Sequence, residues 1–186
     1  MNLLSALDAY RPWNQQEERD CEELRRRLRS GEDLYGRDNL SAHLTASAWV
    51  VSPDRTRVLL AYHNLYDSWA WLGGHVDGER DLLAVALREV REESGLAEVR
   101  PVSEDIYSVE ILAVNGHEKN GQYVPSHLHL NVTFLLEASP TAPVHCKPGE
   151  NSRVGWFSLE DAVTASSEPW FQERIYRKLN EKLIRL

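Results

Sequence analysis

The stretch Gly73–Leu96, GGHVDGERDLLAVALREVREESGL, decides the fold because it joins a glycine-rich loop to a helix of unusual charge. Apolar residues at helical spacing predict a helix over 81–94, and Gly95 is placed to end it in the left-handed conformation. Projection at about 100° per residue predicts one apolar face. Its members are Leu82, Leu83, Ala86, Leu87 and Val90.

Three glutamates, Glu89, Glu92 and Glu93, lie together at one edge of that face. Charge runs on helices are usually solvated surfaces, here with an i,i+4 pair between Arg88 and Glu92. However, Glu89 and Glu93 are like charges at the same spacing, and their repulsion grows at a half-buried edge. A hard cation such as Mg²⁺ or Mn²⁺ removes this conflict, because it prefers carboxylate oxygens. The pattern therefore favours a metal site over a bare charged surface.

The composition is ordinary for a soluble globular protein. The 186 residues are 42% hydrophobic and 27% charged, with a net charge of -8. This acidity disfavours binding to long nucleic acids, which requires clustered positive charge. Cys21 and Cys146 form no recognisable disulfide or metal pattern, which favours a reducing compartment. Neither a leader nor a membrane span is predicted, so the expected location is cytoplasmic and no membrane partner is expected.

The flanking segments predict an α/β protein. Alternating apolar residues predict strands over 43–51, 56–62, 106–114, 127–138 and 153–157, and the first two form a hairpin around Ser-Pro-Asp-Arg. Helices are predicted over 14–31, from the N-cap Ser158, and over 168–186. Segments 68–79 and 117–126 are interpreted as loops. We expect one domain over 1–186, with a helical extension over 1–40 and an α/β/α sandwich with a mixed sheet over 41–186.

Residues 73–96 also resemble the Nudix box, Gly-x5-Glu-x7-Arg-Glu-U-x-Glu-Glu-x-Gly-U, in which U is bulky and apolar. The matching residues are Gly74, Arg88, Glu89, Val90, Glu92, Glu93, Gly95 and Leu96. The surrounding strand order is also similar to that family from about 43 to 165. The resemblance implies a Nudix-like fold and a hydrolase that cleaves a diphosphate bond in a nucleoside diphosphate linked to another moiety.

One position departs from the family pattern. Arg80 stands where the first glutamate of the box belongs, and in the family that glutamate pairs with the residue that is here Arg88. Either Glu79 or Asp81 takes over that role in a re-spaced loop, or the pair is lost. The first alternative is favoured because the metal-binding half of the box is complete.

The resemblance also assigns roles to residues. It implies that Mg²⁺, or Mn²⁺, is held by the Gly73 carbonyl together with Glu89, Glu92 and Glu93, while Arg88 orients the glutamates. Glu93 and Glu92 are the catalytic candidates in the box. Glu150, in KPGENSRVGWF, is the candidate for the additional glutamate that many Nudix enzymes supply from a later loop. Gly74 and His75 are the substrate-binding candidates.

Other histidines are less specific. His127 and His129 alternate along a strand and therefore share one face. A zinc pair is conceivable there, but the sequence offers no obvious third or fourth ligand, so a pocket wall or a satisfied sheet face is the favoured interpretation. His63 is placed to approach the same cleft as His75.

Two other functions stay open. A Nudix-fold sensor that binds a nucleotide without cleaving it is kept in play by Arg80. An enzyme like isopentenyl-diphosphate isomerase shares the fold, but it needs a cysteine near the Trp-rich loop, and Cys21 and Cys146 lie elsewhere. The expected partner is a phosphorylated small molecule derived from a nucleotide, and the N-terminal helix suggests a homodimer.

Overall fold

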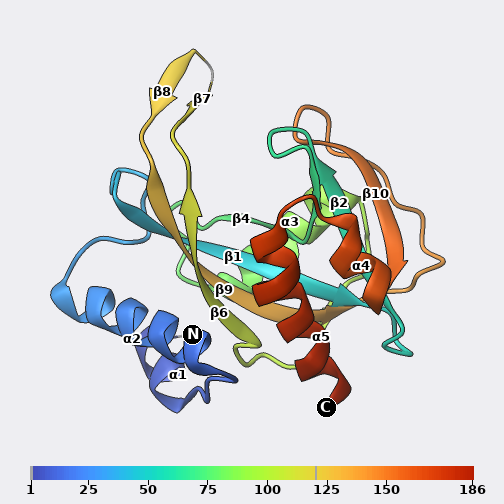
Figure 1. Ribbon diagram of the computed structural model, residues 1–186, viewed down its shortest axis with the longest axis horizontal. Helices are drawn as coiled ribbons and strands as arrows, with labels where there is room; N and C mark the ends of the chain where they lie inside the picture. Colours follow the sequence, from blue (N-terminus) through green and yellow to red (C-terminus); the bar gives the residue numbers. More distant parts are fainter. Residues whose placement is uncertain (1, 120) are drawn as a thin grey trace.

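The computed structural model describes residues 2–119 and 121–186, and its centre is a mixed β-sheet (Figure 1). The strands that form its main path are β10 (Asn151–Ser158), β2 (Arg57–His63), β1 (Ala42–Val51), β9 (His127–Glu137) and β5 (Arg100–Pro101), in this spatial order. Three further strands extend it: β3 (Ser68–Ala70) pairs with β2, β4 (Leu72–His75) with β1, and β6 (Ser108–Val114) with β9. The β1–β9 pair is parallel and the other pairs are antiparallel, which confirms the mixed sheet.

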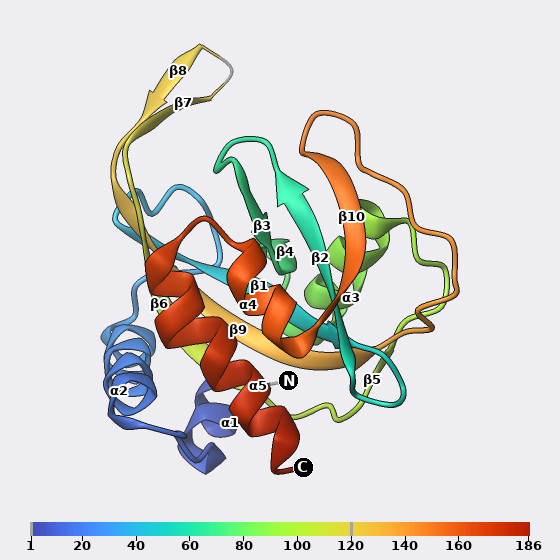
Figure 2. The ribbon, with the colours of Figure 1, turned by 45° about the vertical axis from the view of Figure 1, so that its right-hand side comes forward.

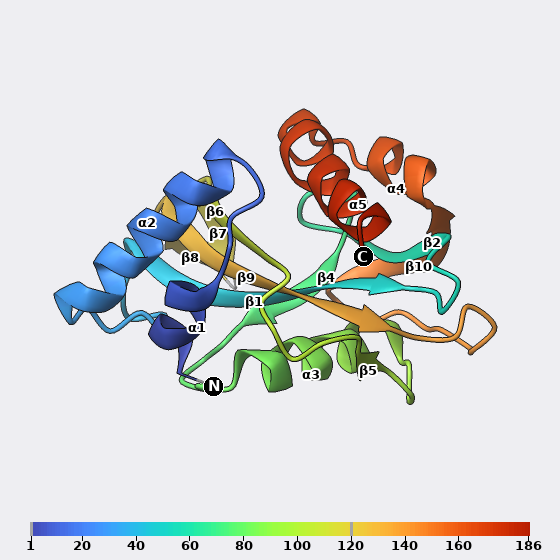
Figure 3. The same ribbon diagram turned by 90° about the horizontal axis from the view of Figure 1, so that it is seen from below.

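Helices cover both faces of this sheet (Figure 3). Helix α3 (Leu82–Ser94) lies on one face, while α4 (Leu159–Ala165) and α5 (Arg177–Ile184) lie on the other. A π-helical turn, Phe171–Tyr176, runs directly into α5. The α/β/α sandwich predicted from the sequence is therefore confirmed.

The central strand β1 has no exposed residue, because both of its faces are covered. Its alternate residues divide between two cores. Leu44, Ala48 and Val50 pack on the side of α3, whereas Trp49 and Val51 pack beneath α5. On the face of β1 that points toward α5, the first half of the strand is polar instead and carries His43, Thr45 and Ser47. This change from polar to apolar along one strand face marks the half of β1 at which a polar site can form.

The N-terminal helices α1 (Leu3–Ala9) and α2 (Gln15–Ser30) pack beside the sheet (Figure 2). Helix α2 covers the edge strand β6, because Glu17 accepts a hydrogen bond from the Val109 N–H at 3.2 Å and Asp20 accepts one from the Ile111 N–H at 3.3 Å. An unpaired strand edge invites aggregation, and a covering helix removes that hazard. The extension is thus a cap on the domain.

Two segments interpreted as loops contain strands. Segment 68–79 forms β3 and β4, which pair with β2 and β1 although their sequence is rich in tryptophan and glycine. Segment 117–126 forms a two-stranded hairpin of β7 (His117–Lys119) and β8 (Gln122–Val124), and its Asn120 lies outside the described residues. Figure 1 shows this hairpin projecting from the body of the protein. Both segments form strands because their backbones pair with another strand, and polar side chains do not prevent such pairing.

Helix α3 is rotated slightly from the predicted orientation. Leu82, Ala86 and Val90 are fully buried as expected, but Val85 is buried as well, and Leu83 and Leu87 are only half-buried. The helix begins after the N-cap Asp81, whose side chain accepts a hydrogen bond from the Ala84 N–H, and it ends at Gly95 with φ of 70°. The rotation turns Glu93 inward, toward β4.

No helix in residues 2–119 and 121–186 combines the length and apolar character that a bilayer crossing requires.

Candidate active site

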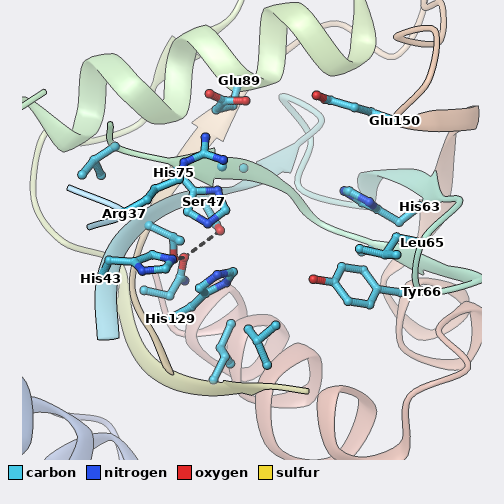
Figure 4. Close-up of a pocket in the computed structure, with 18 of the residues that line it drawn as sticks. Arg37, His43, Ser47, His63, Leu65, Tyr66, His75, Glu89, His129 and Glu150 are labelled. Atoms are coloured by element: carbon cyan, nitrogen blue, oxygen red, sulfur yellow. Dashed lines mark hydrogen bonds between the residues drawn. The ribbon is translucent and has the colours of Figure 1, made fainter. Parts of the chain in front are cut away.

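A cleft of about 1890 Å³ opens between α3, the polar half of the sheet and the loops around it. Its lining includes every residue to which the sequence assigned a catalytic, metal-binding or substrate-binding role: Gly73, Gly74, His75, Arg88, Glu89, Glu92, Glu93 and Glu150. Segments separated by more than 70 residues in the chain meet here. Figure 4 shows Glu89 and Glu150 entering the cleft from different elements, with His63 and Tyr66 on the Glu150 side.

Glu93 is the most buried carboxylate of the cleft, with a relative exposure of 2%. It accepts a hydrogen bond from the Gly73 N–H at 3.1 Å, and its other oxygen lies 3.6 Å from His63 Nε2. Burial raises the pKa of Glu93, although the His63 and Gly73 contacts act in the opposite direction. Asn151 donates to the Glu93 backbone carbonyl at 2.9 Å, which attaches the end of α3 to the start of β10.

Glu89 lies against Gly74. A Cβ at residue 74 would stand 2.7 Å from the Glu89 carboxyl carbon, so only glycine leaves room for this carboxylate. A Cβ at Gly73 would meet the opposite side, 2.5 Å from the Ser47 hydroxyl. Because β4 has no side chain at these two glycines, only its backbone lies between the glutamates of α3 and the polar residues of β1. Both groups therefore open onto a single cleft.

Arg88 pairs with the glutamates of its own helix, at 2.9 Å from Glu89 and 3.8 Å from Glu92. The orienting role that the resemblance implies for Arg88 stays a prediction. The prediction that Glu79 or Asp81 becomes its ion-pair partner is wrong for the residues that the structure describes. Glu79 instead accepts the backbone N–H groups of Arg80 and Asp81 at 2.7 and 2.9 Å, because the re-spaced turn directs it toward the helix start.

Arg80 has an environment of its own. Its guanidinium group lies over the Tyr35 ring, 4.5 Å from the centroid. The residue therefore lies at the rim of the cleft and stacks on an aromatic ring that precedes β1.

Lys147 is a site residue that the sequence analysis missed. Its ammonium lies 2.9 Å from Glu92 and 2.9 Å from Glu150, so it joins α3 to the loop before β10. The hydrogen bond from Lys147 lowers the pKa of Glu92. The only local signal was the three-residue spacing between Lys147 and Glu150; the contact with Glu92 depends on the fold.

Neither cysteine belongs to the described lining of the cleft: Cys21 is a buried residue of α2, and Cys146 is half-buried in the loop before β10. The isomerase-like alternative therefore has no thiol at the glycines of β4.

A mixed sheet between helices, with the carboxylates of one helix set against a double-glycine strand, is the arrangement of the Nudix fold. A family model, the NUDIX domain, matches residues 42–179. The chain belongs to the Nudix family.

Solved structures support the fold. An Ap4A hydrolase of C. elegans superposes with a TM-score of 0.55 at 22% identity, covering 77% of this chain and 98% of that one. A NUDIX-family hydrolase from Clostridium perfringens superposes with a TM-score of 0.54 at 22% identity, covering 77% of this chain and 97% of that one. The dihydroneopterin triphosphate pyrophosphohydrolase of E. coli superposes with a TM-score of 0.56 at 15% identity, covering 77% of this chain and 96% of that one. Among curated proteins, no sequence matches this chain.

Proposed function

We propose that this protein hydrolyses a diphosphate bond in a nucleoside diphosphate linked to another moiety, with Mg²⁺ or Mn²⁺ as cofactor. The observation that carries the proposal is the convergence of Glu89, Glu92 and Glu93 on the double-glycine strand inside one cleft. A binding-only protein has no need to bury a carboxylate there, since burial of an unneutralised charge is costly.

The donor set fits a hard divalent cation. Carboxylate oxygens are the ligands that Mg²⁺ prefers, and Mg²⁺ commonly completes its shell with water and substrate phosphate oxygens. The space that a Cβ on Gly74 would fill belongs to the Glu89 carboxylate, so the strand is shaped around this donor. Glu89, Glu92 and Glu93, with the Gly73 carbonyl, would hold the ion. When bound, it offsets the negative charge of the diphosphate.

The remaining roles, accepting a proton and positioning the carboxylates, fall to side chains of the protein. Glu93, whose pKa is raised by burial, accepts a proton from the attacking water, because a carboxylate of raised pKa is a stronger base. His63 and the Gly73 N–H fix the orientation of that carboxylate. Arg88 holds Glu89 and Glu92 in place. Glu150 enters from the opposite loop and is the second candidate base.

The cleft is larger than most small-molecule pockets, which typically occupy about 300–1,000 Å³. Its size supports a substrate with groups on both sides of the diphosphate. ADP-ribose, nucleotide sugars, dinucleoside polyphosphates and altered nucleoside triphosphates are the compounds to compare.

The test is a hydrolysis assay of these compounds with Mg²⁺, in which a coupled phosphatase releases phosphate from the product. Glu93→Gln is expected to lower kcat by about 10²–10⁴-fold, the usual contribution of a general base. Glu98→Gln, an exposed glutamate just beyond α3, is the matched control and is expected to retain activity. If no compound turns over with either metal although one of them binds, the protein is a nucleotide sensor and the hydrolase proposal fails.

A further inference from the structure

Four histidines converge at the polar end of the sheet, apart from the glutamates of α3. One ligand nitrogen from each of His43, His75, His127 and His129 can be chosen so that all four atoms lie within 4.8 Å of one another. Figure 4 shows three of them, His43, His75 and His129, gathered beside the strand that carries the glycines. The sequence suggested only the pair on β9.

The sheet register brings these residues together. His43 stands directly opposite His129 in the parallel β1–β9 pair, and His127 precedes His129 by two residues on the same face. On the other side of β1, His75 is the register partner of Thr45 and lies 4.8 Å from His129, measured between ring centroids. Three strands thus contribute to one cluster, although 86 residues separate His43 from His129 in the chain.

The tautomers of two members direct lone pairs into the cluster. His43 Nδ1 lies 3.2 Å from the Asn39 carbonyl, and His127 Nδ1 lies 2.8 Å from the Pro125 carbonyl. Because a carbonyl only accepts hydrogen bonds, Nδ1 is the donor in both contacts, and Nε2 is the nitrogen that can act as an acceptor or a metal ligand. The Nε2 of His127 faces the Nε2 of His129 at 3.2 Å. A backbone carbonyl on the distal nitrogen is also how proteins orient metal-binding histidines.

His43 Nε2 has no hydrogen-bond partner, and the residue is only 6% exposed. A buried polar atom without a partner costs roughly 1–3 kcal/mol. The nearest companions of His43 are the rings of the other three histidines, with centroids at 4.7 to 5.2 Å. The lone pair of His43 Nε2 therefore has no partner. A cation that is bound among the imidazole rings would accept this electron pair.

The charge around the cluster permits a cation. Arg37 is the charged side chain that Figure 4 places beside His75. Its guanidinium forms two hydrogen bonds with the Asp77 carboxylate, each 2.5 Å long, so this pair carries no net charge.

We propose that His43, His75, His127 and His129 form a binding site for a transition-metal ion of the zinc class, separate from the carboxylate site of α3. Imidazole nitrogens suit zinc, whereas Mg²⁺ prefers oxygen. Tetrahedral zinc with nitrogen ligands at about 2.0–2.1 Å holds neighbouring ligands roughly 3.3 Å apart. The Nε2 atoms of His127 and His129 are already 3.2 Å apart. The ligand nitrogens of His43 and His75 lie within 4.8 Å of these atoms.

The site opens onto the cleft, which all four histidines line. The Gly73–Gly74 backbone stands between it and the glutamates. Zinc there would add positive charge to the same cleft, on the other side of the Gly73–Gly74 backbone from the glutamates. This proposal does not depend on the hydrolase activity, and its test measures metal binding alone.

The experiment titrates chelator-treated protein with Zn²⁺ in the presence of excess Mg²⁺, using a chromogenic chelator as competitor, and repeats the titration with Co²⁺ to read the visible absorption of a tetrahedral ion. We expect one equivalent to bind. His129→Gln and His75→Gln are expected to weaken binding at least about 100-fold and to abolish the tetrahedral Co²⁺ spectrum. His145→Gln, at an exposed histidine that lies against Gly95 at the end of α3 and outside the cluster, is the matched control.

The variants Glu93→Gln and Glu92→Gln separate the two sites, since they should leave Zn²⁺ affinity within about threefold. Thermal unfolding followed by circular dichroism verifies that each variant is folded, and Zn²⁺ should raise Tm only where the four histidines are intact. The proposal is overturned if Zn²⁺ binding is lost in the glutamate variants and retained in the histidine variants, or if folded wild-type protein binds no Zn²⁺ in competition with the chelator.

Discussion

Gly74 and the Glu89 carboxylate are fitted to each other: a Cβ on Gly74 would lie 2.7 Å from the carboxyl carbon of Glu89. Real Cβ atoms do not approach so closely, so the carboxylate would have to move. Glu89 is also held by Arg88 at 2.9 Å, which leaves it little freedom to move without breaking that pair. The glycine therefore sets the position of a proposed metal ligand.

Gly74→Ala is accordingly predicted to displace Glu89 and to lower kcat/KM about 100-fold, as expected for a misplacement of about 1 Å at a catalytic centre. Mn²⁺ affinity, measured by calorimetry, should fall in parallel. Gly155→Ala is the control, because its added Cβ would meet nothing closer than 3.7 Å. Unchanged metal affinity in Gly74→Ala would remove Glu89 from the metal site.

Lys147 is predicted to oppose metal binding in the absence of substrate, because its ammonium is paired with both Glu92 and Glu150 at 2.9 Å. Lys147→Met should lower the Mn²⁺ dissociation constant by about three- to tenfold, equivalent to roughly 0.7–1.4 kcal/mol. Lys147→Arg preserves the charge and should behave like wild type in the same calorimetric titration. Weaker Mn²⁺ binding in the methionine variant would mean that Lys147 positions the glutamates.

Arg80→Glu restores the family residue, and we predict that it changes kcat/KM by less than about threefold, because Arg88 is already paired with Glu89 and Glu92. Loss of the cation–π contact with Tyr35 should lower the free energy of unfolding by about 0.5–1 kcal/mol. Arg80→Gln separates the two effects, since it removes the contact without adding a carboxylate. A gain in kcat/KM of tenfold or more in Arg80→Glu alone would show that the native pairing of Arg88 is defective.

Glu17 is predicted to govern acid stability. It is fully buried and lies 3.1 Å from Lys182 and 3.4 Å from Lys178. Burial alone would raise the pKa of Glu17, but these ammonium groups and hydrogen bonds from Trp13 and Ser108 lower it from 4.5 to about 2. A depressed folded-state pKa contributes stability that is complete above the unfolded value and is lost as the pH falls through the folded value.

Glu17→Gln should therefore reduce the free energy of unfolding at pH 7 by about 3 kcal/mol. The difference from wild type, followed by urea unfolding, should shrink between pH 4.5 and 2, where the wild-type carboxylate becomes protonated. Glu18→Gln, at the exposed neighbouring residue on α2, should change neither the free energy of unfolding at pH 7 nor its dependence on pH. A difference that stays constant across this pH range would contradict the assignment.

The sequence by itself determined the elements whose signals are local. The helix after the glycines, its glycine end and the grouping of Glu89, Glu92 and Glu93 follow from the 3.6-residue period, which acts within a few turns. The main strands were also predicted, because each is bounded by turn residues. The short strands β3 and β4 were missed, since their pairing with β2 and β1 is supplied by the neighbouring backbone and not by their own side chains.

Only the tertiary structure decided which distant residues meet. The parallel register of β1 and β9 sets His43 beside His129, and the antiparallel β4 adds His75, so a pair seen in the sequence becomes a cluster of four. In the same way the fold joins Lys147 to Glu92 and Glu17 to Lys178. Helix periodicity is a property of the chain, whereas strand register depends on how whole faces pack. A single sequence therefore predicts the carboxylates of α3 but not the histidines across the sheet.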